Sequence, residues 1–421
     1  MNNKIYWLLG IFFLASFFSA YGQLENSNIS SDFLKDYIPP NYKNHRISIY
    51  PQLRESVVRS DNLDRDRLTA SLYSTYIFNM QKDKSDTEVV AVLDTDFISE
   101  KVNDVRIDNN NLLQAIVNVR SNRYQYISGK AFVSAGAELF AGNQFYYLAE
   151  DQNTFNQTFS IPLSIGFGRP FVVNDAWQAM SLFNDLECYG IAADRSRTKE
   201  VADLISTQRN TQFLDGRLGR IQNRAELLDY LNDNNIVNLS ALSSAVIHDS
   251  YRFENFQFRL SGFRIRGGII PSLVSFNYGD NSIIPGNDTD LTLDPFASFD
   301  YYLPISEDFQ LDINLFFRYR DQPYLESNEE NVFSTNNQVT FSWLPNRRTR
   351  LGTNLRFNTS GNDFTYSIQS LQLNLTFDYY VSPAVQWNTR VYFNKEWRDL
   401  LGIESTLFDQ SISIGLSYFI I

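Results

Sequence analysis

This chain of 421 residues has little of what most catalytic and metal sites require. It contains one cysteine, Cys188, and two histidines, His45 and His248. A single cysteine excludes an internal disulfide, and the sequence has no Cys/His cluster, phosphate-binding glycine loop or calcium loop. No serine motif frames either histidine, although a nucleophilic serine needs a neighbouring base. The sequence therefore predicts a protein that is not an enzyme and has no cofactor or metal.

Long apolar runs and excess positive charge are also missing. A short apolar run behind Lys4 ends in the small residues Ala20 and Gly22, which predicts a cleaved signal peptide over residues 1–22. Beyond it, no segment has the roughly 18 unbroken apolar residues of a membrane-spanning helix. The net charge of -12 argues against nucleic acid as a partner, because binding phosphates requires a basic face.

Aromatic residues and strict alternation are abundant. The chain has 34 Phe and 24 Tyr, yet its mean hydropathy is only -0.29. Near the C-terminus, Ile412, Ile414 and Leu416 alternate with Ser411 and Ser413, and a period of two indicates a strand with one apolar and one polar face. A transmembrane barrel has such alternation, with an average that is polar and with aromatic residues at both membrane interfaces.

The alternation recurs in fourteen segments, six before and eight after a central non-alternating region. The predicted strands cover 46–57, 68–80, 88–99, 112–126, 130–147, 155–168, 258–278, 288–303, 309–321, 332–344, 348–359, 366–381, 384–397 and 406–421. We therefore predict an all-β transmembrane antiparallel barrel of about 14 strands, with 12 as the alternative, in the cell outer membrane and in contact with its lipid. A secreted soluble β-sandwich is the competing interpretation.

The connections between the last eight strands are of two alternating kinds. Tight turns contain Pro304, Pro345 and Pro383. The longer polar connections cover 279–288, 322–331, 359–365 and 398–405. Outer-membrane barrels have short periplasmic turns and long external loops, so the proline turns are predicted to lie on the periplasmic side.

The central region reads as a helical insert. Amphipathic stripes predict helices over 176–190, 198–209, 212–233 and 240–252, which together form a small bundle. The chain thus divides into the signal peptide, N-terminal barrel strands at 23–173, the insert at 174–255 and C-terminal barrel strands at 256–421. Strand parity places the insert in the periplasm. Its length far exceeds that of a turn, which indicates a periplasmic protein partner or a gating role.

One sequence motif resembles a known group of proteins. Ile-Gly-Phe-Gly-Arg at 165–169 is followed by Val-Asn-Asp-Ala-Trp-Gln-Ala at 173–179. This passage from a strand into a helical insertion resembles an uncharacterised family of outer-membrane barrels from Bacteroidota. The resemblance implies the fold and the location, and it implies no activity.

The polar face of the predicted strands carries charges of both signs. The lumen-facing candidates are Arg264, Arg266, Arg318, Arg356, Arg390, Asp300 and Asp378. Arginine on one strand beside aspartate on the next predicts cross-strand pairs that partly close the lumen. The alternative is a narrow channel with an arginine-lined constriction that favours anions. The function indicated is a porin-like channel for small solutes, and the alternative is a non-conducting structural or adaptor barrel whose insert docks a partner.

Overall fold

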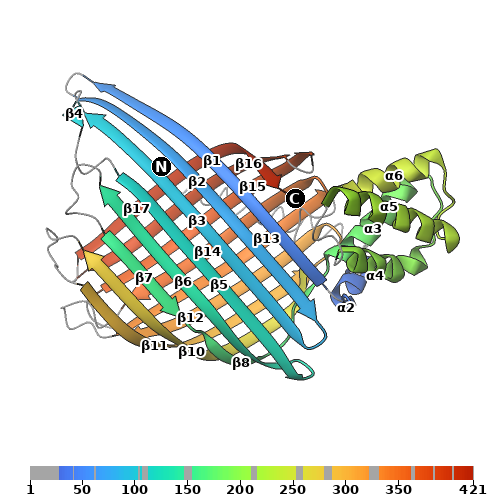
Figure 1. The fold of residues 1–421 in the computed structure, drawn as a ribbon, viewed down its shortest axis with the longest axis horizontal. Coiled ribbons are helices and arrows are strands. Elements are labelled where there is room, and N and C mark those ends of the chain that lie inside the picture. The colour runs from blue at the N-terminus through green and yellow to red at the C-terminus, as the bar shows by residue number, and fades with distance from the viewer. Residues whose placement is uncertain are drawn as a thin grey trace.

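The computed structural model describes residues 28–420 apart from short segments, and its strands form one sheet that closes into a barrel (Figure 1). The segments outside the described residues are 41, 61–62, 103–104, 107–111, 147–153, 210–215, 253–258, 279–286, 322–330, 362–365, 383–384 and 401–402. The predicted signal peptide at 1–22 also lies outside the described residues.

A short helix and nine strands precede the insert. They are α2 (Asn28–Asp36), β1 (Tyr42–Ser60), β2 (Leu63–Lys82), β3 (Ser85–Val102), β4 (Val105–Arg106), β5 (Leu112–Ser128), β6 (Ala131–Tyr146), β7 (Thr154–Ser160), β8 (Leu163–Phe167) and β9 (Phe171–Val172). Eight strands follow the insert. They are β10 (Leu260–Tyr278), β11 (Asn287–Pro304), β12 (Phe309–Asp321), β13 (Asn331–Asn346), β14 (Thr349–Gly361), β15 (Tyr366–Ser382), β16 (Val385–Leu400) and β17 (Ile403–Ile420).

The seventeen strands fill fourteen positions around the barrel, and all their pairings are antiparallel. β7 and β8 lie end to end in one position, because both pair with β6 on one side and with β10 on the other, and β9 continues along β10. β4 is a two-residue strand beside β3. The ring closes where β1, which pairs with β2, also pairs with β17. The predicted antiparallel barrel of fourteen strand positions, rather than twelve, is confirmed.

The sixth predicted strand, at 155–168, is wrong in one respect, because it is interrupted. β7 ends at Ser160 and β8 begins at Leu163, and the backbone N–H of Ile161 donates to the carbonyl of Pro271 at 3.0 Å. Pro162 has no N–H to donate, so the regular ladder cannot run through this point.

The predicted long loop at 398–405 is also wrong. β16 runs to Leu400 and β17 begins at Ile403, and these two residues are register partners. Polar residues here continue the strands without alternation. Beyond the bilayer both faces of a strand contact water, so the hydropathy pattern that reveals a strand inside the membrane is lost there.

Proline residues within the strands coincide with the ends of ladders. The pairing of β11 with β12 stops at Phe296, next to Pro295, and Pro271 lies opposite the interruption between β7 and β8. Pro51 of β1 lies two residues beyond Ile49, the last residue that pairs with β17. Proline removes one ladder hydrogen bond, so it is tolerated where a strand edge is free.

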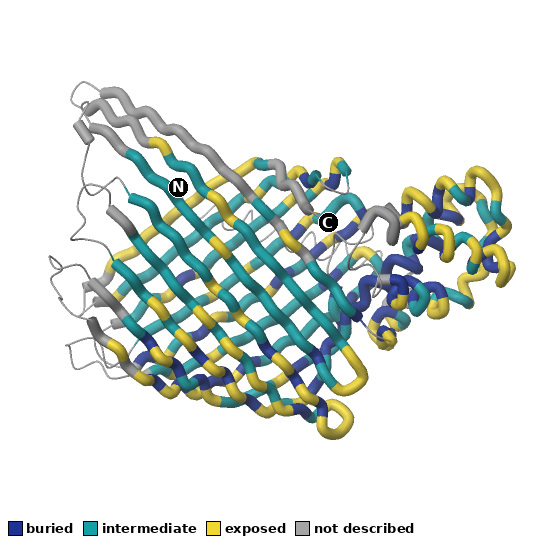
Figure 2. The backbone as a smooth tube through the Cα atoms, viewed as in Figure 1, coloured by how far each residue is buried: buried dark blue, intermediate teal, exposed yellow. Residues whose placement is uncertain are grey.

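The outward face of the barrel is an apolar belt, and Figure 2 shows exposed and less exposed residues alternating along the strands. Exposed large apolar side chains include Leu139, Ile165, Ile265, Leu273, Phe317, Val339, Leu355, Leu371, Trp387 and Ile412. The alternation also places neighbouring aromatic residues on opposite faces of the wall. Tyr379 is exposed, whereas Tyr380 is buried. In water this belt would be an extended exposed apolar surface, so it identifies the face that contacts lipid.

The insert is a bundle with its own hydrophobic core, at one end of the barrel (Figure 1). Its elements are α3 (Asn174–Cys188), the 3₁₀ turn η4 (Arg195–Arg197), α4 (Thr198–Arg209), α5 (Gly216–Asp233) and α6 (Ala241–Arg252). Leu34 and Tyr37, in or just after α2, and Leu344 near the end of β13 are buried in the same core. Within the described residues, no helix is long and apolar enough to cross a membrane. Helix α2 was not predicted from the sequence.

Tight turns gather at the end of the barrel that carries the insert (Figure 1). They join β2 to β3 at 83–84, β5 to β6 at 129–130, β11 to β12 at 305–308 and β13 to β14 at 347–348. The predicted turn at Pro383 lies outside the described residues. The described tight turns beside Pro304 and Pro345 therefore lie at the same end of the barrel, as the sequence predicts.

Arg259 holds the insert to the barrel. Its side chain is 0% exposed and donates to the carbonyls of Ser306 at 2.7 Å, Phe309 at 3.0 Å and Glu307. Its backbone N–H donates to Asn174 Oδ1 at 2.6 Å, at the start of α3. Burial lowers the pKa of Arg259 to about 10, so the guanidinium stays charged at neutral pH.

A second arginine forms a parallel attachment from the β13–β14 turn. Arg347 donates to Asp185 Oδ2 of α3 at 3.0 Å and to the carbonyl of Ser250 in α6. Ser250 Oγ donates to the same carboxylate oxygen at 2.6 Å. The neighbouring Arg348 forms a more exposed pair with Asp249 at 2.9 Å. The insert is thus attached to two barrel turns by the hydrogen bonds of Arg259 and Arg347.

Replacing Arg259 with Met should destabilise the junction, because three buried carbonyls would lose their donor. We expect the free energy of unfolding to fall by about 3 kcal/mol, measured by urea unfolding of the protein folded in lipid vesicles. The matched control is Arg348→Met, which removes an exposed ion pair and should cost less than about 1 kcal/mol. Equal unfolding midpoints for the two variants would contradict this role of Arg259.

Candidate functional site

The inner face of the barrel is polar and charged, and it carries every lumen-facing candidate. Arg264 is buried, whereas its neighbour Ile265 is 52% exposed on the outer face. Likewise Phe317 and Leu355 are exposed beside the less exposed Arg318 and Arg356. Because successive side chains of a strand point to opposite faces, the arginines point inward.

Two of the arginines take part in a network that crosses the lumen. Arg264 of β10 pairs with Asp300 on the adjacent β11 at 3.1 Å and with Glu88 of β3, also at 3.1 Å. Three barrel positions lie between β3 and β10, a path of roughly 19 Å along the wall at the usual strand spacing. A direct contact between these strands therefore runs through the lumen and occupies this part of it.

Aromatic side chains pack against the arginines of this network. Tyr124 of β5 is 0% exposed, and its ring centroid lies 4.3 Å from the guanidinium carbon of Arg264. Arg266 donates to the Tyr124 hydroxyl at 3.0 Å and to Ser298 Oγ at 2.8 Å. Phe132 packs edge-on against Tyr124, with centroids 5.4 Å apart. This side of the lumen is thus a packed core of charged and aromatic side chains.

The arginine of the Gly-Phe-Gly-Arg motif extends the network to the insert end of the barrel. Arg169 donates to Asp86 Oδ1 at 2.7 Å and to the carbonyl of Asp83 in the β2–β3 turn at 2.8 Å. Asp86 also accepts a hydrogen bond from the Tyr126 hydroxyl at 2.8 Å. The motif's Gly168 has φ +100°, and a Cβ there would lie 2.3 Å from the carbonyl oxygen of Phe263. Glycine and arginine at these positions are therefore explained by the local structure.

Arg318 is also paired. Its Nε donates to Asp294 Oδ2 at 2.7 Å, and Arg320 donates to the same oxygen at 3.1 Å. Asp294 is 0% exposed, so its charge depends on these two arginines. Arg264 and Arg318 thus follow the interpretation of a salt-bridged lumen, and Arg266 is held there by hydrogen bonds.

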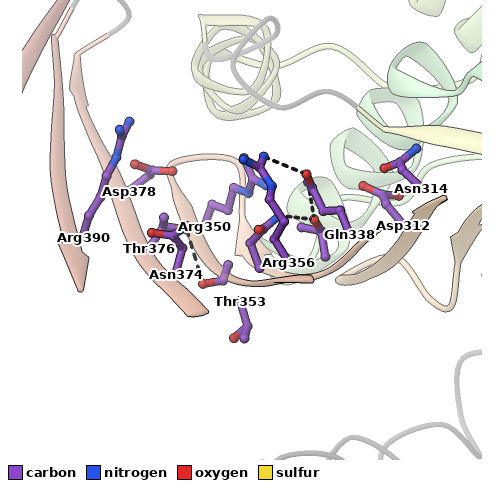
Figure 3. Close-up of a pocket in the computed structure, with 13 residues that line it drawn as sticks. Asp312, Asn314, Gln338, Arg350, Thr353, Arg356, Asn374, Thr376, Asp378 and Arg390 are labelled. Atoms are coloured by element: carbon purple, nitrogen blue, oxygen red, sulfur yellow. Dashed lines mark hydrogen bonds between the residues drawn. The ribbon is translucent and has the colours of Figure 1, made fainter. Parts of the chain in front are cut away.

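The other side of the lumen is open. A cavity of about 440 Å³ lies against β12 to β16. Its lining includes Asp312, Asn314, Gln338, Arg350, Asn354, Arg356, Asp378 and Arg390. Figure 3 shows Arg356 and Gln338 pointing toward one another, and Arg390 and Asp378 close together at one end of the cavity. Arg356 donates to Gln338 Oε1 at 3.0 Å.

Charge in the cavity is mixed, with a small positive excess. Three arginines, Arg350, Arg356 and Arg390, and two aspartates, Asp312 and Asp378, line it. The predicted set is therefore divided by the tertiary structure, because Arg356, Arg390 and Asp378 face the cavity while Arg264, Arg266, Arg318 and Asp300 are paired elsewhere. Within the described part of the chain, no group of three His, Cys, Asp or Glu side chains could hold a metal ion.

Several residues of this site were not identified from the sequence. Arg350 has the right parity and could have been found by the same argument as Arg356. Glu88 and Tyr124 lie in the weakly patterned N-terminal strands, and Arg169 lies between β8 and β9. Their roles depend on contacts across the lumen, which local alternation does not encode.

Comparison with known proteins gives only distant structural likeness. No family model matches the chain, and no curated protein matches it in sequence. Solved barrels that resemble it include outer-membrane expressed OmpT of Vibrio cholerae, at 8% identity and TM-score 0.33, covering 86% of this chain and all of that one. CymD, a monoaromatic hydrocarbon channel, matches at 8% identity and TM-score 0.32 over 93% of both chains. The ferric yersiniabactin uptake receptor FyuA from Yersinia pestis matches at 7% identity and TM-score 0.26 over 85% of this chain and 49% of the receptor.

Scores this low carry no argument about function. The assignment of class rests on the molecule itself, in which a closed antiparallel barrel has a polar, charged interior and an apolar outer belt. Closure pairs backbone groups between strands, which is what the hydrocarbon region requires. The protein is an outer-membrane β-barrel.

Proposed function

We propose that the protein is a porin-like channel for small solutes, with its helical insert in the periplasm. The observation that carries the proposal is the polar cavity of about 440 Å³ beside β12 to β16. A purely structural barrel gains nothing from leaving such a space, because filling it would add packing contacts. The network around Arg264 narrows the route to one side of the lumen, so the channel passes small solutes only. Tight turns at the insert's end favour the periplasmic orientation.

The route favours anions weakly. The three arginines of the cavity outnumber its two aspartates, and no other charged side chain is part of the described lining. Rings of basic side chains select anions, but Asp378 beside Arg390 offsets part of the field.

Purified protein in a planar bilayer should show small, discrete conductance steps. A variant lacking 176–252 should also conduct, since the cavity is lined entirely by barrel strands. Heat-unfolded protein added at the same concentration serves as the control. Absence of conductance from both the complete protein and the deletion variant would reject the channel.

Replacing Arg356 and Arg390 together with Gln should shift the reversal potential in a KCl gradient toward cations, because the charge excess of the cavity changes sign. Arg318→Gln is the matched control, since Arg318 is paired with Asp294 away from the cavity. We expect that variant to keep wild-type selectivity and to unfold more easily, because a buried carboxylate loses a partner. An equal shift in selectivity from both changes would show that the cavity does not set it.

The second candidate is an adaptor barrel whose insert docks a periplasmic protein. The observation that favours it is that Tyr189, Ile221 and Leu242 of the insert are each more than half exposed, although they are large and apolar. Single large apolar side chains are common on surfaces, so this candidate ranks below the channel.

Docking can be tested with photocrosslinking residues in living cells. A benzophenone side chain at Ile221 or Leu242 should give one discrete crosslinked product, while the same group at the exposed Lys199 of the same bundle should give none. Identical products from all three positions, or from none, would remove the support for docking.

A further inference from the structure

The arginines of the cavity differ from other arginines of the lumen in how their charge is balanced. Arg264 and Arg318 each form an ion pair with an aspartate of the adjacent strand. No carboxylate among the described residues forms an ion pair with Arg350, Arg356 or Arg390. Three guanidinium groups therefore line one cavity without an ion-pair partner in the part of the chain that is described.

Arg356 is the least compensated of the three. Its register partner on β15 is the neutral Gln372, whereas the partner of Arg350 on the same strand is Asp378. Asp378 also lies close to Arg390 (Figure 3). The Nε of Arg356 is buried, and it has no hydrogen-bond acceptor among the described residues. A buried guanidinium N–H without an acceptor is costly, so this position favours a bound anion.

The neutral part of the lining indicates what the rest of the solute is made of. It consists of Asn, Gln and Thr side chains and one glycine, and the described lining includes no aromatic residue and no Val, Leu, Ile or Met. A side-chain amide both donates and accepts hydrogen bonds, as a hydroxyl group does. The side chain of Asn374 makes no hydrogen bond with another described residue, so it can bind a solute. Such a lining suits a polyhydroxylated molecule rather than an alkyl chain or an aromatic ring.

The charge balance of the cavity favours a solute with one negative charge. Three arginines and two aspartates leave one positive charge in excess, which a single carboxylate neutralises. A phosphate monoester carries about -1.5 to -2 at neutral pH, and it would be repelled by Asp312 and Asp378. The volume of about 440 Å³ lies within the range of roughly 300–1,000 Å³ that is typical of small-molecule sites.

We propose that the cavity is a binding site for small polyhydroxylated acids, such as sugar acids, and that Arg356 binds their carboxylate. The amide side chains of the lining, Asn374 among them, bind the hydroxyl groups. This role rests on the channel proposed above and deepens it, because the solute is selected by binding as well as by charge.

Binding is measured by calorimetry on the barrel in nanodiscs, with empty nanodiscs as the background, so the result does not depend on conduction. The probes are gluconate, glucose, hexanoate and glucose 6-phosphate. We expect gluconate to bind about tenfold more tightly than glucose, which lacks the charge, and than hexanoate, which lacks the hydroxyl groups.

Each of the other probes can contradict one part of the proposal. Glucose binding as tightly as gluconate would overturn the recognition of the carboxylate, and equally tight hexanoate would overturn the recognition of hydroxyl groups. Glucose 6-phosphate binding more tightly than gluconate would overturn the preference for one charge. No binding of gluconate would overturn the site itself.

The role of Arg356 is tested by Arg356→Gln, which should weaken gluconate binding by about tenfold. Arg350→Gln is the matched control, because it removes the same charge from the same strand and cavity, but beside Asp378. We expect this control to weaken binding by about twofold at most. Arg356→Lys keeps the charge without the planar pair of donors, and it should recover only part of the affinity. An equal loss in the two Gln variants would overturn the role of Arg356.

Planar bilayers separate the site from the channel. Gluconate should block the KCl current of the wild-type barrel in a saturable way, and Arg356→Gln should require about ten times more gluconate for the same block. A barrel that binds gluconate in nanodiscs but conducts no KCl would keep the site and reject the channel. A barrel that conducts KCl but binds no gluconate would keep the channel and reject the site.

Discussion

The rest of this structure depends on the need to pair every backbone N–H and C=O group that lies in the membrane. Fourteen strand positions meet that need by closing into a ring, and antiparallel pairing lets tight turns join neighbouring strands at one end. The same requirement explains where the ladder fails. Pro271 and Pro295 lie at interruptions, and the carbonyl of Pro271 is satisfied by Ile161 across the break.

A second constraint applies to the inner face. A charged side chain can be buried away from water only where it has an ion-pair or hydrogen-bond partner. On one side of the lumen the solution is a dense network, in which Arg264 joins β10, β11 and β3 and stacks on Tyr124. On the other side Arg350, Arg356 and Arg390 line the polar cavity of about 440 Å³. A single barrel thus combines a packed half with a half that contains a polar cavity.

The insert depends on buried arginines as well. Arg259 and Arg347 donate to backbone carbonyls, and Arg347 also donates to the half-exposed carboxylate of Asp185, so they fix both the position and the orientation of the bundle on the barrel turns. Burial raises the pKa of the nearby Glu307 carboxyl, since burial disfavours its charged form. Asn184 donates a hydrogen bond to this carboxylate, which opposes the effect. The junction is therefore a specific interface, with Leu344 of the barrel buried inside the core of the insert.

The sequence by itself determined the period of two, the strand positions, the insert and the inward direction of the arginines, because these follow from local hydropathy. It could not reveal the break at Ile161–Pro162, which needs Pro271 from another strand, or helix α2, whose apolar residues have meaning only against the core of the insert. Nor could it divide the arginines into paired and open sets. Parity shows which face a side chain occupies, but the partner of Arg264 is Glu88, 176 residues away and across the lumen. Barrel closure alone decides which strands face one another, so the packed half and the cavity are properties of the tertiary structure.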